Sequence, residues 1–149
     1  MKKFIAIAVI AILVGGFVLP ACKKYDDGPA FTVLTKKMRL DGEWVVESYY
    51  EDDVDRTSAY RSLIESELLV MDKKGTWTLT ATENFFHTTG TENGTWTWAT
   101  DKEDLSKVTT SNSPSTLEVW HILRLTNKEF WYHVRDGNGT RLEYHLEPK

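Results

Sequence analysis

Apolar and polar residues alternate at every second position through most of the chain after residue 42. This period is typical of antiparallel strands that bury one face and expose the other. Eight strands are predicted on this basis, over residues 43–50, 67–72, 76–82, 95–100, 105–109, 116–125, 129–135 and 141–147. The pattern therefore predicts an all-β domain.

Short segments rich in Gly, Asn and Asp separate several of these strands, as expected for hairpin turns. They cover residues 72–75, 92–94, 127–128 and 136–139. At the last of them, a three-residue turn pairs Tyr132 with Tyr144 and keeps the apolar side chains of both strands on one face. We expect Gly139 in the left-handed conformation there, because glycine adopts it without a steric cost.

The hairpin before it has a predicted two-residue turn at Asn127 and Lys128. Cross-strand partners must share a face, so this turn determines which side chains point inward. It pairs Leu125 with Phe130, Leu123 with Tyr132 and His121 with Val134. His121 is then expected on the inner face, and the outer face is expected to carry Trp120, Ile122 and Trp131.

Consecutive antiparallel strands leave two open edges, which proteins commonly remove by closing the sheet on itself. An eight-stranded up-and-down barrel is therefore predicted, with a two-sheet sandwich as the alternative. The longest connection, residues 51–66, has the apolar spacing of a short amphipathic helix at Tyr60, Leu63 and Ile64. This segment is expected either to cover the barrel mouth as a lid or to cap one end of the core.

The first 22 residues follow a different pattern, with a basic start and then an apolar run. The run over residues 4–18 is shorter than the roughly 20 residues that span a bilayer, so it is interpreted as a signal peptide. It ends at Leu19-Pro20-Ala21-Cys22, which resembles the lipobox cleaved by lipoprotein signal peptidase. The expected division is a signal peptide at 1–21, a lipidated tether at 22–37 and a barrel domain at 38–149. A plain secretory signal followed by a free thiol is the alternative.

Cys22 is the only cysteine of the chain, so acylation of its sulfur is expected to join the protein to membrane lipid. Removal of residues 1–21 leaves 16 basic and 22 acidic side chains, a net charge of −6. This balance argues against nucleic-acid binding, which needs a basic surface. Lys24 followed by Asp26 and Asp27 resembles the signal by which some Gram-negative bacteria export lipoproteins to the outer face of the outer membrane. The alternative is an ordinary hydrophilic tether, with the protein on the periplasmic face.

Several short motifs recur along the predicted strands. They are Gly42-Glu43-Trp44, Gly75-Thr76-Trp77, Gly94-Thr95-Trp96, the segment 122–132 and the segment 144–148. Together with the lipobox, they resemble the lipocalin-like domain family of Gram-negative lipoproteins over residues 38–149. The resemblance implies a small antiparallel barrel and, by comparison with lipocalins, a small hydrophobic ligand in its interior. It implies no catalytic residue.

Large side chains on the inner face are the candidate ligand contacts. They are Trp44, Trp77, Trp96, Trp98, His121, Tyr132 and Tyr144. The alternative is that these aromatic groups fill the barrel as core, because an eight-stranded barrel has little spare room. No metal site is expected, since His121 is placed inside while His133 and His145 are placed outside. No cofactor is expected either.

Catalytic signatures such as Gly-x-Ser-x-Gly, His-Glu-x-x-His or a phosphate-binding loop do not occur in the sequence. The expected function is therefore that of a non-catalytic lipoprotein, anchored in the outer membrane, whose barrel binds a small hydrophobic molecule. The alternative is a solid barrel that docks onto another envelope protein through the outward Trp120, Ile122 and Trp131.

Overall fold

The computed structural model describes residues 34–100, 103–111 and 113–149. The predicted signal peptide, the lipidation site at Cys22 and the tether up to residue 33 lie outside the described residues. The described elements are α2 (Lys36–Leu40), β1 (Gly42–Glu51), β2 (Val54–Asp55), α3 (Thr57–Leu63), β3 (Ile64–Asp72), β4 (Thr76–Glu83), β5 (Thr89–Trp98), β6 (Asp104–Thr109), β7 (Thr116–Leu125), β8 (Phe130–Arg135) and β9 (Arg141–Pro148).

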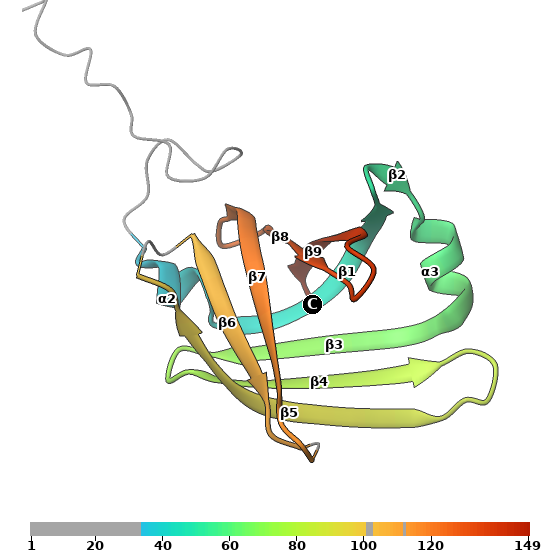
Figure 1. Cartoon of the computed structure of the whole chain (residues 1–149), viewed down its shortest axis with the longest axis horizontal. Coiled ribbons are helices and arrows are strands. Elements are labelled where there is room, and N and C mark those ends of the chain that lie inside the picture. The colour runs from blue at the N-terminus through green and yellow to red at the C-terminus, as the bar shows by residue number, and fades with distance from the viewer. Residues whose placement is uncertain (1–33, 101–102, 112) are drawn as a thin grey trace, which may run out of the picture.

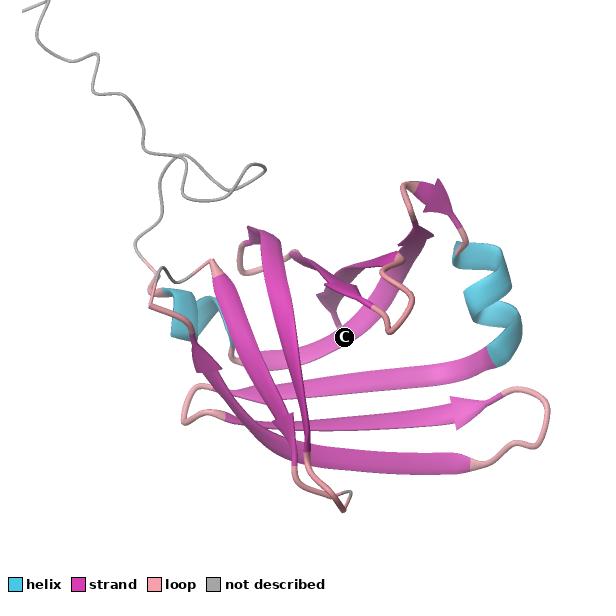
Figure 2. Ribbon diagram, viewed as in Figure 1, coloured by secondary structure: helices cyan, strands magenta, loops and turns pink. Residues whose placement is uncertain are grey.

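The strands form one antiparallel barrel, as Figures 1 and 2 show. Strands β1 and β3 to β9 pair with their neighbours in sequence order, and β9 pairs again with β1 to close the sheet. The short strand β2 only extends the edge of β1. The predicted eight-stranded up-and-down barrel is thus confirmed, and the two-sheet sandwich is not formed.

The last hairpin has the predicted register. Tyr132 pairs with Tyr144, and Phe130 pairs with Leu146. Gly139 has a φ of +85°, in the left-handed region that favours glycine. The three-residue turn between β8 and β9 is therefore confirmed, and it keeps the apolar side chains of both strands on one buried face.

Strand β5 begins at Thr89 rather than at the predicted residue 95, so the predicted turn at 92–94 is wrong. Gly94 lies inside the strand, and the indole of Trp77 on β4 packs against it. A Cβ atom at Gly94 would lie 2.9 Å from Nε1 of Trp77. Gly94 therefore serves to admit the neighbouring indole and does not form a turn.

The hairpin between β7 and β8 departs from the predicted register. Leu125 pairs with Phe130 as expected, but Ile122 pairs with Tyr132, and the register shifts between Ile122 and Arg124. A bulge of this kind reverses the facing of every residue beyond it. Trp120 and Ile122 are therefore buried in the core, with exposed fractions of 4% and 2%, and the prediction that they face outward is wrong.

One end of the barrel is filled by apolar side chains and sealed by α2. The carbonyl of Leu40 accepts a hydrogen bond from Nε1 of Trp44 at 3.0 Å. Nη1 of Arg39 donates to the carbonyl of Leu125 at 2.5 Å. The fully buried side chains of this region include Leu40, Met71, Trp77, Leu105, Leu125, Phe130 and Leu146.

Helix α3 lies at the opposite end of the barrel from α2, as Figure 1 shows. Strands β1 and β3 pair only over Gly42 to Trp44, and α3 packs against both of them. The predicted helix in the 51–66 connection is confirmed, but Leu63 is 67% exposed and does not belong to its packed face. Among the described helices, none has the length and hydropathy of a membrane span.

Candidate functional site

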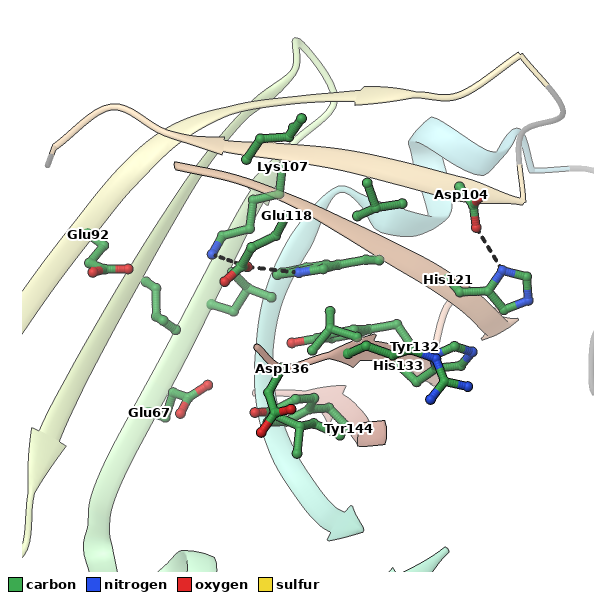
Figure 3. A pocket seen from close by; sticks show the side chains of 18 of the residues that line it. Glu67, Glu92, Asp104, Lys107, Glu118, His121, Tyr132, His133, Asp136 and Tyr144 are labelled. Atoms are coloured by element: carbon green, nitrogen blue, oxygen red, sulfur yellow. Dashed lines mark hydrogen bonds and ion pairs between the residues drawn. The ribbon is translucent and has the colours of Figure 1, made fainter. Parts of the chain in front are cut away.

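The barrel half next to α3 contains an open cavity of about 870 Å³ (Figure 3). Inner-face side chains of β3 to β9 line it, among them Glu67, Leu79 and Lys107. Side chains from the outer face of β7 and β8, such as Val119 and His133, line its outer part. Tyr60 of α3 contributes to the lining from the helix. This volume lies within the range of about 300–1,000 Å³ that is common for small-molecule sites.

The cavity also reaches a side opening between β7 and β8. These strands pair only from His121 onward, so the segment 116–120 of β7 has no pairing with β8. Leu117 and Val119 of this segment are 65% and 51% exposed, and both line the cavity together with Asp136. A ligand therefore has a lateral route into the barrel.

Five stacked or tilted rings form one side of this region, which we call the aromatic wall: Trp120, Tyr132, Tyr144, Tyr49 and Tyr60. Successive ring centroids along this order lie 4.1, 5.2, 5.0 and 5.0 Å apart. Cross-strand pairing explains the order, because Tyr132 pairs with Tyr144 and Tyr144 pairs with Tyr49. The wall is thus a row of inner-face positions on neighbouring strands, extended by α3.

The phenols of this wall are held in their neutral form. Burial, assisted by the Glu51 carboxylate, raises the pKa of Tyr49 to about 12. Burial also raises the pKa of Tyr60, Tyr132 and Tyr144 above the usual value of a phenol. Tyr60, Tyr132 and Tyr144 line the cavity, so their ring edges and neutral hydroxyl groups are available to a ligand at physiological pH.

Charged side chains also occupy inner-face positions. Lys107 of β6 is only 5% exposed. Its Nζ lies 3.1 Å from Oε2 of Glu118 and 4.0 Å from the ring centroid of Trp77. The same Glu118 oxygen accepts a hydrogen bond from Nε1 of Trp120 at 3.2 Å. The buried ammonium is therefore compensated by a carboxylate and an aromatic face.

Glu67 of β3 and Glu92 of β5 line the cavity as well. The hydroxyl of Tyr60 donates a hydrogen bond to Glu67. Burial raises the pKa of the Glu67 carboxyl, while this hydrogen bond and the charge of Lys107 act in the opposite direction. The Glu67 carboxylate is thus partly desolvated and held by Tyr60 of α3.

These charged residues are not among the predicted site residues, although a local signal for them exists. Glu67 lies two positions before the buried Leu69, and Lys107 lies two positions after the buried Leu105. Residues two apart in a strand share a face, so both belong to the interior. Alternation alone would have placed a carboxylate and an ammonium inside the barrel.

The predicted ligand contacts fall into two groups. Tyr132 and Tyr144 line the cavity. The four predicted tryptophans belong instead to the packed core at the filled end of the barrel. Trp44, Trp77 and Trp96 are buried there, and Trp98 packs against them. The barrel therefore combines both expected states of the interior, a filled half and an open half.

The predicted inward position of His121 is wrong. The β7 bulge pairs it with His133, and the two ring centroids lie 5.0 Å apart. Nδ1 of His121 lies 2.7 Å from Oδ1 of Asp104, at the outer rim of the cavity. The outer face therefore carries His121, His133 and also His145. The ring of His145 stacks on that of Trp131, with 4.0 Å between the centroids. Within the described ranges, no group of three or more His, Cys, Asp or Glu side chains has the arrangement of a metal site.

Comparison with known proteins shows distant structural similarity alone. No protein-family model and no curated protein matches the chain. Among solved structures, a redesigned β-barrel is similar, with 12% sequence identity and a TM-score of 0.44. The similarity covers 80% of this chain and 99% of that chain. The fold assignment rests on the strand pairing of this chain.

Proposed function

We propose that this protein is a non-catalytic, lipid-anchored envelope lipoprotein whose barrel binds a small molecule with an apolar or amphipathic body. The cavity of about 870 Å³ beside the aromatic wall is the observation that supports ligand binding most directly. The signal-like sequence ending at Cys22 and the resemblance to lipocalin-like lipoproteins support the membrane anchor and the outer-membrane location.

The ligand-binding proposal is tested by filling the cavity. Leu79 of β4 lines the cavity, and the neighbouring Thr80 faces the other side of the same strand. The Leu79→Trp variant should lower the fraction of protein that retains ligand by about tenfold, because the larger side chain occupies the ligand's space. Native mass spectrometry of the full chain, purified from membranes in mild detergent, measures that fraction.

Thr80→Trp is the matched control, since it adds a tryptophan to the outer face of the same strand. It should retain ligand as the parent protein does. A parent protein that carries no bound molecule and binds no added hydrophobic probe would contradict the proposal.

The membrane anchor is tested at the lipidation site. The Cys22→Ala variant should move from the membrane fraction to the soluble fraction and should fail to incorporate labelled palmitate. Two or more acyl chains hold a protein on a bilayer at about 0.8 kcal/mol per buried methylene, and this variant has none. Lys23→Ala leaves the thiol in place and should stay in the membrane fraction. Release of both variants, or of neither, would contradict the anchor.

Docking onto another envelope protein is the second candidate function. Trp120 and Ile122, which motivated it in the sequence, are buried. Phe85 and Phe86, between β4 and β5, support it instead, because they are 86% and 72% exposed. Exposed large apolar side chains often mark a contact surface. Copurification of one defined envelope protein with a chain whose cavity is empty would favour this function.

A further inference from the structure

The charge of the cavity lining restricts the kind of molecule that it can bind. Among the described lining residues, five carboxylates stand against two permanent cations. The carboxylates are Glu67, Glu92, Asp104, Glu118 and Asp136, and the cations are Lys107 and Arg135. With neutral histidines, the formal charge of the lining is −3. A concave surface of one sign concentrates ligands of the opposite sign.

The negative charge is strongest inside the barrel. Figure 3 shows Glu67, Glu92 and the Lys107–Glu118 pair around the same open space, while Asp104 and His121 form a separate pair. Glu118 already lies 3.1 Å from the Lys107 ammonium. The interior therefore holds more carboxylates than cations before any ligand enters.

Glu67 is the carboxylate for which desolvation matters most. Its charge lies beneath Tyr60, and burial raises the pKa of its carboxyl. A desolvated carboxylate is stabilised by a cation that enters the same low-dielectric space. A bound anion would have the opposite effect, because two like charges would share the cavity.

The aromatic wall supplies the second half of the recognition. Trp120, Tyr132, Tyr144, Tyr49 and Tyr60 form a continuous series of rings with centroid separations of 4.1 to 5.2 Å. Because Tyr132 stacks on both Trp120 and Tyr144, the wall presents ring edges and phenol oxygens to the cavity, and these can pack against the body of a ligand. The ring of Trp120 is already contacted by a cation of the protein, since Nζ of Lys107 lies 5.2 Å from its centroid.

We propose that the ligand of this cavity is a small organic cation, a protonated or quaternary amine with an apolar or aromatic body. The inference rests on the proposed ligand-binding function and specifies the chemical class of the ligand. The carboxylates of Glu67 and Glu92 face the charge of the amine, and the aromatic wall contacts its body. An anionic ligand such as a fatty acid would be repelled by the same carboxylates.

Three probes with the same benzyl body and different charge test the inference. They are benzyltrimethylammonium, benzyl alcohol and phenylmethanesulfonate. Isothermal titration calorimetry of the full chain in non-ionic detergent measures their affinities. The cation should bind at least about tenfold more tightly than the alcohol, as expected for a charge beside partly desolvated carboxylates, and the sulfonate should bind most weakly.

Glu67→Gln and Glu92→Gln test the carboxylates without changing their size. Each should weaken binding of the cation by about tenfold and leave binding of the alcohol unchanged. We expect the Glu67→Gln cavity to stay folded, because the new amide oxygen remains an acceptor for the Tyr60 hydroxyl. Unchanged affinity for the alcohol would show that it does. Glu147→Gln on the outer face of β9 is the matched control and should alter neither affinity.

The results of these titrations separate the two proposals. Equal affinities for the cation and the alcohol, or cation binding that is unaffected by both variants, would overturn the cationic ligand and leave the binding function standing. The same conclusion follows if the sulfonate binds most tightly. Binding of none of the three probes would overturn both proposals.

Discussion

The Gly94→Ala variant is expected to lose about 4 kcal/mol of its free energy of unfolding, from overpacking and a broken, partly buried hydrogen bond. A Cβ atom at Gly94 would lie 1.8 Å from the carbonyl oxygen of Val108 on β6. That oxygen accepts a hydrogen bond from Nε1 of Trp77 at 3.1 Å. The methyl group therefore separates β5 from β6 or removes the indole from its acceptor.

A loss of this size is a large part of the roughly 5–15 kcal/mol that stabilises a typical domain. Urea unfolding followed by tryptophan fluorescence measures it. Gly90→Ala is the matched control, since Gly90 lies in the same strand and an added Cβ would have no neighbour within 4 Å. It should change the free energy of unfolding by less than about 1 kcal/mol. Equal midpoints for the two variants would refute the close packing at Gly94.

Phe130→Ala is expected to lower the free energy of unfolding by about 3–5 kcal/mol. Phe130 is 0% exposed, and its ring lies 5.6 Å from that of Trp44 and 5.1 Å from that of Tyr132, between centroids. Truncation removes contacts with both rings and leaves a cavity at the filled end of the barrel. Surrounding strands cannot collapse into this space without breaking their pairing with β8.

Phe85→Ala makes the same chemical change at a residue that is 86% exposed. It should alter the free energy of unfolding by no more than about 0.5 kcal/mol. The comparison uses the same urea titration. A similar loss in both variants would show that Phe130 does not occupy the barrel core.

The hairpin between β8 and β9 shows how much a sequence can determine when two strands are adjacent. Only a three-residue turn brings Tyr132 opposite Tyr144 and Phe130 opposite Leu146, and these are the observed pairs. The argument needs only the alternation of each strand and the connection between them. Gly139 then takes the left-handed conformation that this turn requires.

The preceding hairpin shows where the same reasoning fails. Its turn is short and Leu125 pairs with Phe130 as expected, yet the shift between Ile122 and Arg124 reverses the rest of β7. His121 consequently points outward, and Trp120 joins the aromatic wall. Nothing in the local sequence distinguishes a regular strand from a bulged one here, because Trp120, Ile122 and His121 are all large side chains.

Gly94 illustrates a second limit. Glycine preceded by asparagine is a common hairpin signal, so the sequence predicts a turn at residues 92–94. The structure uses the missing side chain to admit the indole of Trp77 from β4. The partner that requires this glycine lies on another strand, and the dipeptide itself contains no information about it.

Strand periodicity and the order of the strands predicted an antiparallel sheet in meander order, because alternation is a local property that burial of one face enforces. The pairing of β9 with β1 then decided between the closed barrel and the two-sheet sandwich, which the sequence had left open. The tertiary structure decided which half of the interior is filled and which half is open. It also brought Glu67, Glu92 and Glu118 from three strands to one cavity beside the aromatic wall. Such a site depends on contacts across the closed sheet and on one bulge in β7, neither of which a single strand encodes.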